Sequence, residues 1–129
     1  MLKIIDTNYA LRYIVQDNFD QALEAKEMID DGAYLLPESL VEMVYVLSKV
    51  YNAERREIYF AILDLLQDVE MIDKTIYENA ARVYGKTKLD YVDCILVVRH
   101  KLLNDKIYTF DKKLEKELKS VELGTTINK

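Results

Sequence analysis

Short apolar runs alternate along this chain with stretches in which apolar residues recur at helical spacing. The short runs predict four strands, with a weaker fifth at the end of the chain. They lie at Leu2–Ile5, Ala33–Leu36, Val69–Ile72, Lys106–Phe110 and Val121–Ile127. The first run would be the central strand of the sheet, because it begins at residue 2 and finds all its partners downstream.

The stretches between these runs predict helices, because their apolar residues fall three or four positions apart. The first expected helix begins after Thr7 as its cap. The others are expected to run from Asp20 to a glycine at Gly32, from Ser39 to Val50, from Glu54 to Leu66, from Thr75 to a glycine at Gly85, from Asp90 to Leu103 and from Asp111 to Leu118. Strands that alternate with helices predict βαβ units. The expected fold is therefore α/β, with three layers (α/β/α) and a mostly parallel sheet of four to five strands.

Length and composition fit one globular domain spanning residues 1–129, without repeats or low-complexity tracts. The net charge of −5 argues mildly against non-specific nucleic-acid binding, although bound divalent ions would reverse the local sign. One cysteine, Cys94, predicts a reduced buried thiol, which is typical of the cytoplasm. We expect no signal peptide and no membrane contact, since no apolar run approaches membrane-spanning length.

Four acidic residues fall at one predicted edge of the sheet. Asp6 and Asp111 directly follow strands, whereas Glu42 and Asp93 lie in the first turns of helices. Because helices in βα units run antiparallel to the strands, helix starts and strand ends share an edge. In open α/β sheets this edge carries the chemistry.

Each carboxylate also has a structural explanation. Asp6 and Asp111 can be helix N-caps, and Ser39-x-x-Glu42 matches a capping box. Asp93 can follow an N-cap at Asp90, where the helix dipole favours a negative charge. Asp93 lies within an apolar run, however, and a carboxylate buried there needs a partner or a metal.

Convergence of the four carboxylates would require a counter-charge, because they cannot all stay ionised close together. Mg²⁺ or Mn²⁺ is the natural choice, since both prefer oxygen ligands. The sequence has no cluster of Cys and His for zinc and no partnered nucleophile for a catalytic triad.

These motifs resemble the PIN domain family, and within it the small VapC-type toxin nucleases. The resemblance rests on Ile5–Asn8 with Arg12 one turn later, Glu38–Glu42, Leu89–Leu96 and Tyr108–Leu114. It covers nearly the whole chain in order and spacing. Cys94 stands where the family often has Ala, which should not impair metal binding.

The resemblance implies a Mg²⁺- or Mn²⁺-dependent ribonuclease acting on single-stranded RNA, as the toxin of a type II toxin–antitoxin pair. It assigns Asp6, Glu42, Asp93 and Asp111 as the catalytic and metal-binding set. It further assigns Asn8 and Thr109 as partners of these ligands, Asp90 to an outer-sphere water, and Arg12 and Lys86–Lys88 as RNA-phosphate contacts. A homodimer and a small antitoxin are the implied protein partners.

Two alternatives stay open on the sequence. One is a PIN-fold module for housekeeping RNA processing or protein interaction, without a toxin role. The other is a receiver-like phosphoacceptor domain, for which Asp73-Lys74 offers an acceptor after the third strand. That second alternative leaves Glu42 and Asp93 unexplained.

Overall fold

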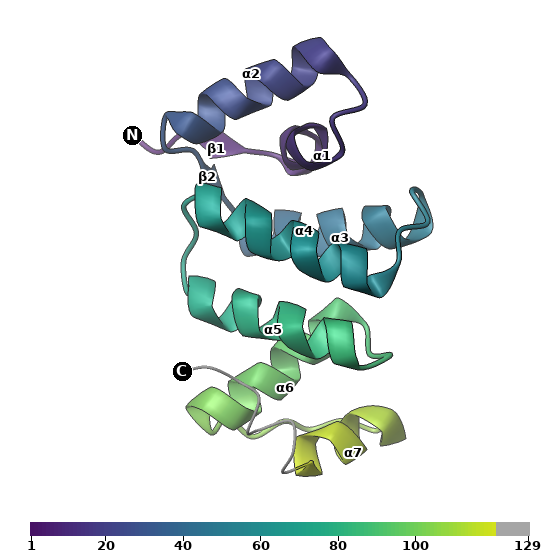
Figure 1. Ribbon diagram of the computed structural model, residues 1–129. Coiled ribbons are helices and arrows are strands. Elements are labelled where there is room, and N and C mark those ends of the chain that lie inside the picture. The colour runs from purple at the N-terminus through teal and green to yellow at the C-terminus, as the bar shows by residue number, and fades with distance from the viewer. Residues whose placement is uncertain (121–129) are drawn as a thin grey trace. The chain divides into compact units, whose positions relative to one another are not determined.

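A computed structural model describes residues 1–120 of the chain (Figure 1). These residues fall into two compact units, one formed by Met1–Lys74 and the other beginning at Thr75. The predicted fifth strand at Val121–Ile127 lies outside the described residues. We describe each unit by itself.

The first unit contains two short parallel strands and four helices. In chain order they are β1 (Ile4–Ile5), α1 (Thr7–Val15), α2 (Phe19–Asp30), β2 (Tyr34–Leu35), α3 (Pro37–Lys49) and α4 (Arg55–Asp68). Helix α1 packs against both α2 and α3, and α3 packs against α4. Much of the core is formed by five fully buried residues, Leu35, Leu40, Met43, Ile62 and Leu65. In the helices, the apolar residues that recur at helical spacing in the sequence are therefore the ones that are buried.

The sheet is parallel, as predicted, but smaller than predicted within residues 1–120. Strand β1 pairs in register with β2, with Ile4 opposite Tyr34 and Ile5 opposite Leu35. On its other side β2 forms a single parallel bridge to Glu70, in the run predicted as the third strand. The Leu35 amide donates to the Glu70 carbonyl over 2.9 Å, and the Glu70 amide donates to the Ala33 carbonyl over 3.0 Å. In this part of the chain β2, rather than β1, therefore has neighbours on both sides.

The ends of the helices correct two details of the prediction and confirm a third. Asp6, not Thr7, caps α1, because the Asp6 carboxylate accepts the Tyr9 amide over 2.9 Å. Helix α3 starts at Pro37, two residues before the expected Ser39, because proline fits the first turn, where amides lack partners. Gly32, with a φ of 88°, follows the end of α2 as predicted, because glycine adopts the left-handed region at little cost.

The second unit contains helices. They are α5 (Lys74–Lys86), which begins at the last residue of the first unit, α6 (Tyr91–Leu103) and α7 (Lys112–Lys119). Ala80, Ala81, Cys94, Val97 and Val98 are fully buried in it, and α6 packs against α7. Gly85 lies inside α5 and does not end it, contrary to the prediction.

The predicted fourth strand, Lys106–Phe110, is not a strand in the structure. A strand needs a neighbouring backbone to complete its hydrogen bonds, and the described part of this unit has no sheet. Tyr108 and Phe110 project outward, with 89% and 101% of their surface exposed. Apolar character alone was therefore insufficient to predict a strand here. Among the described residues, no helix is long and apolar enough to cross a membrane.

Candidate active site

Asp6 stands between the end of β1 and the start of α1. One carboxylate oxygen accepts the Tyr9 amide, so the capping role considered from the sequence is present. The side chain is exposed and lines a depression of about 310 Å³. A carboxylate has further lone pairs, so capping leaves acceptor capacity for another ligand.

Glu42 is joined to the Asp6 junction through Thr7. The Thr7 hydroxyl lies 3.2 Å from a Glu42 carboxylate oxygen, to which it can donate, and 3.4 Å from the Ser39 carbonyl. The capping-box interpretation of Glu42 is wrong, because Leu36 occupies the N-cap of α3 and Ser39 lies within the helix. The Glu42 side chain therefore turns toward the end of β1, as the active-site interpretation expects.

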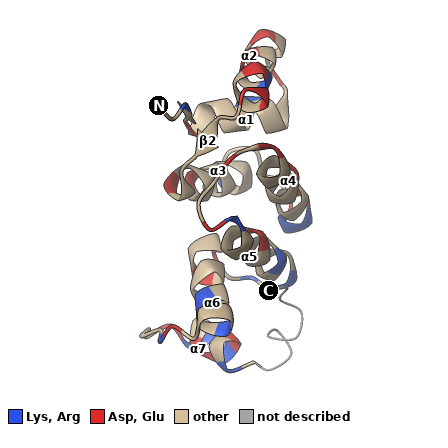
Figure 2. Cartoon of the chain, turned by 90° about the vertical axis from the view of Figure 1, so that its left-hand side faces the viewer, with Lys and Arg blue, Asp and Glu red and all other residues tan. Residues whose placement is uncertain are grey.

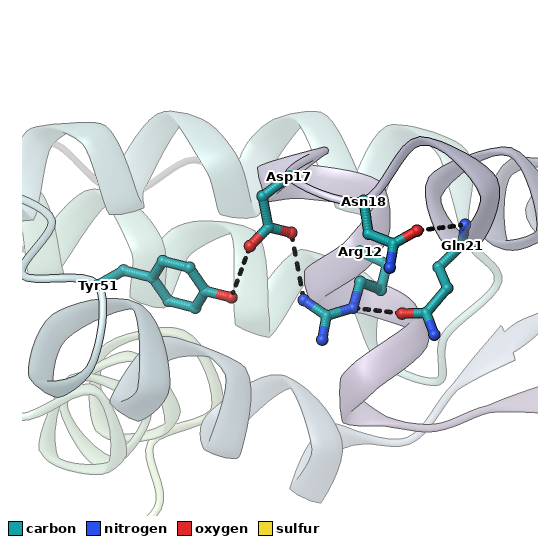
Figure 3. Close-up of polar contacts among 5 residues, drawn as sticks. All are labelled: Arg12, Asp17, Asn18, Gln21 and Tyr51. Atoms are coloured by element: carbon teal, nitrogen blue, oxygen red, sulfur yellow. Dashed lines mark hydrogen bonds and ion pairs between the residues drawn. The ribbon is translucent and has the colours of Figure 1, made fainter.

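The depression beside Asp6 is lined by Asn8, Tyr9, Arg12, Gln21 and Glu24. Arg12 crosses from α1 to α2, where its Nε donates to the Gln21 side-chain oxygen over 2.7 Å (Figure 3). Its guanidinium also pairs with Asp17 at 3.2 Å, and the Tyr51 hydroxyl donates to the same carboxylate at 3.5 Å. These contacts hold the Arg12 side chain in a defined position.

Asp93 lies in the first turn of α6 and is half-buried. Burial raises the pKa of Asp93 above its ordinary value, and the negative charges of Asp90 and Asp111 raise it further. Both effects disfavour the ionised form of the carboxyl group. The apolar run predicted a buried carboxylate at this position, and the structure shows a half-buried one.

Asp111 caps α7, as the structural interpretation of the sequence expected. One of its carboxylate oxygens accepts the Lys113 amide at 2.8 Å and the Leu114 amide at 3.2 Å. The Thr109 hydroxyl accepts the Asp111 amide at 3.0 Å, so Thr109 fixes the backbone that carries this carboxylate. Asp90 occupies the N-cap position of α6, three residues before Asp93.

The predicted site residues thus form two sets. Asp6, Asn8 and Glu42 belong to the first unit, whereas Asp90, Asp93, Thr109 and Asp111 belong to the second. Within residues 1–120 neither unit by itself gathers three acidic, histidine or cysteine side chains into a group that could hold a metal. Sequence reasoning missed the contact between Thr7 and Glu42, because Thr7 was interpreted as a cap. Its position directly after Asp6 was the available signal.

The donor chemistry of these residues fits a divalent ion. Mg²⁺ and Mn²⁺ prefer carboxylate oxygens, and all four proposed ligands are Asp or Glu.

Known proteins are similar to this chain over the range that contains these residues. The PIN domain family matches the chain over residues 3–117. The chain belongs to the PIN domain family. The matched range includes all four carboxylates, from Asp6 to Asp111.

One relative of the chain carries a functional name. The chain is 25% identical, over 125 residues, to a protein named VapC ribonuclease from Aquifex aeolicus (strain VF5). The alignment covers 89% of this chain and 91% of that protein, so the two correspond along nearly their whole lengths. No solved structure matches the chain.

Proposed function

We propose that this PIN domain is a divalent-metal-dependent endoribonuclease that hydrolyses phosphodiester bonds of single-stranded RNA. The observation that carries the proposal is its similarity, along nearly the whole chain, to a protein named VapC ribonuclease. The family match over residues 3–117 supports the same conclusion, because it extends across every proposed catalytic residue.

The proposed metal ligands are Asp6, Glu42, Asp93 and Asp111. Two observations support this set. The Thr7 hydroxyl holds Glu42 beside the end of β1, where Asp6 begins α1. In the second unit, burial and then the charges of Asp90 and Asp111 raise the pKa of Asp93, as expected for a carboxyl group near other acidic groups.

The proposal also includes the three-layer fold with a mostly parallel sheet of four to five strands that the sequence predicts, of which residues 1–120 show two strands.

A bound Mg²⁺ or Mn²⁺ ion would lower the pKa of a water molecule and stabilise the charge that develops on the phosphodiester. The chain itself supplies the ligands and holds them in place. Thr7 orients Glu42, and Thr109 fixes the backbone of Asp111. Asn8 and Asp90 are proposed to bind waters around the ion, while Arg12 is proposed to contact an RNA phosphate.

We further propose that the protein is the toxin of a type II pair, that it works in the cytoplasm, and that it forms a homodimer inhibited by a small antitoxin. The name of the VapC relative supports the toxin role. The chain's single cysteine, Cys94, is buried, which suits a reducing compartment. Exposed apolar side chains in the first unit, including Phe19, Tyr45 and Val50, suit protein partners.

The deciding experiment is Mn²⁺-dependent cleavage of single-stranded RNA by the full chain, beside its Asp6→Asn and Asp93→Asn variants. We expect metal-dependent cleavage by the natural protein and loss of it in both variants, with unchanged circular dichroism. Substantial Mn²⁺-dependent cleavage by both variants would overturn the proposed site. Absence of cleavage by the natural protein on a pool of random RNA would overturn the function.

A further inference from the structure

The second unit contains a basic depression in which Lys88, expected from the resemblance to contact RNA, lies with two lysines of α7 that the resemblance does not assign. It has a volume of about 200 Å³ and lies between the segment before α6 and helix α7. Its lining residues are Thr87, Lys88, Leu89, Lys113, Lys116 and Glu117. Three lysines from two distant parts of the sequence thus surround one hollow, opposed by one glutamate. In a chain with a net charge of −5, this is a local reversal of sign.

The three lysines are available to a ligand. Lys88, Lys113 and Lys116 are exposed, and within residues 1–120 none of them belongs to an ion pair. Their neighbour Lys112 differs, because it pairs with Glu115 at 3.4 Å and does not line the depression. Figure 2 shows basic residues in blue along α6 and α7.

The depression has two other polar side chains, Thr87 and Glu117, and a buried oxygen of Glu117, Oε2, has no hydrogen-bond partner among the described residues. The Thr87 hydroxyl donates to the Val83 carbonyl at 2.9 Å and accepts the Leu89 amide at 3.3 Å, so its hydrogen-bonding capacity serves the backbone. Burial lowers the pKa of Lys101, and the carboxylate of Glu117 opposes that shift. Glu117 therefore acts at least partly on Lys101 of α6. The ammonium groups are what the depression offers to a ligand.

We propose that Lys88, Lys113 and Lys116 form a binding site for backbone phosphates of single-stranded RNA. The choice of RNA rests on the proposed function. Lysine is a compact, flexible point charge that binds phosphate without reading bases, so this site would add affinity independent of sequence. It would hold the strand through charge, and each engaged lysine would displace a cation from the RNA.

The test measures binding rather than cleavage. A fluorescent oligouridylate is titrated with the full-length Asp6→Asn protein in metal-free buffer over a series of salt concentrations. In this background, Lys113→Ala and Lys116→Ala are compared with Lys112→Ala, which removes the same charge from the same helix. Lys113→Arg tests whether the charge, rather than the length of the side chain, is required.

We expect Lys113→Ala and Lys116→Ala each to weaken binding about fivefold at 0.1 M salt and to reduce the salt slope by about 0.7, the single-strand value for one phosphate contact. Lys112→Ala should have a clearly smaller effect, and Lys113→Arg should bind like the parent. Equal effects of all three alanine variants would overturn the site, since they would reflect net charge alone. Unchanged binding in the Lys113 and Lys116 variants would also overturn it.

The outcome is separable from that of the proposed function. A chain that cleaves RNA but binds it equally well without Lys113 and Lys116 would keep the function and lose this site. A chain that binds RNA through these lysines, yet shows no metal-dependent cleavage, would keep the site and lose the function. A competition assay distinguishes an RNA backbone from a single free anion as the ligand. If a second polyanionic strand competes with RNA and an excess of inorganic phosphate does not, the site binds an extended backbone.

Discussion

At the scale of the residue, Asp6 combines an observed structural role with a proposed role in metal binding. Its carboxylate caps α1 through the Tyr9 amide, and the same side chain is a proposed metal ligand. Asparagine caps a helix about as well as aspartate, whereas alanine does not cap it. The same reasoning applies to Asp111, which accepts two amides at the start of α7. Substitutions at these positions must therefore be chosen to remove charge without removing the cap.

The first prediction separates these two duties. Asp6→Asn should keep the free energy of unfolding within about 0.5 kcal/mol of the parent, whereas Asp6→Ala should lower it by about 1 kcal/mol. Both should abolish metal-dependent cleavage. Urea unfolding and the RNA assay measure the two effects on the same preparations. Retained cleavage in Asp6→Asn, or an equal loss of stability in both variants, would contradict the division.

At the scale of the element, a hydrogen bond between a tyrosine and a carboxylate connects helix α1 to helix α4. The Tyr13 hydroxyl donates to Asp68 over 2.6 Å. This hydrogen bond, with burial and the nearby negative charge, raises the pKa of Tyr13 from 10.0 to about 12. Between these two values the folded protein keeps a proton that the unfolded chain has lost. The resulting stability is complete below pH 10 and disappears as the pH rises toward 12.

The second prediction follows from this loss of stability between pH 10 and pH 12. Tyr13→Phe removes the titrating group, so the variant should lose less stability than the parent between pH 10 and pH 12. Chemical unfolding at the two ends of this range measures the difference. Tyr45→Phe, at an exposed tyrosine of α3, is the matched control and should behave like the parent. A parallel loss of stability in the parent and Tyr13→Phe would show that the hydrogen bond does not hold in solution.

Elements whose signals are local were predictable from sequence. Glycine at residue 32, the apolar spacing of α3 and α4, and the caps at Asp90 and Asp111 all agree with the structure. Their causes lie within a few residues of the chain. The start of α3 was displaced because Pro37 was interpreted only as the end of a strand, although proline also begins helices.

The sheet was less predictable because a strand depends on a distant partner. The run at 69–72 contributes a single bridge through Glu70, and Lys106–Phe110 is not a strand in the described structure. The amino-acid sequence of each segment does not indicate which strand the segment will pair with. Among the site residues, the apolar run around Asp93 predicted a buried carboxylate, and the side chain is half-buried. The contact of Thr7 with Glu42 depends on the three-dimensional arrangement of β1, α1 and α3, which the sequence does not state.

The central claim concerns the whole molecule: the proposal makes Asp6, Glu42, Asp93 and Asp111 the ligands of one metal site. Family membership and the VapC relative support a nuclease. If the four carboxylates bind the same ion, substitution of any one of them should weaken metal binding.

The most direct test is calorimetric titration of Mn²⁺ into the full chain and into its Asp6→Asn and Asp93→Asn variants, with Asp30→Asn as the control. Asp30 is an exposed carboxylate on α2 that pairs with Lys26. Binding of one ion by the four carboxylates predicts that the Asp6 and Asp93 variants each lose on the order of tenfold or more in affinity, while the control binds like the parent. Unchanged Mn²⁺ affinity in either variant would contradict a metal site that uses all four carboxylates.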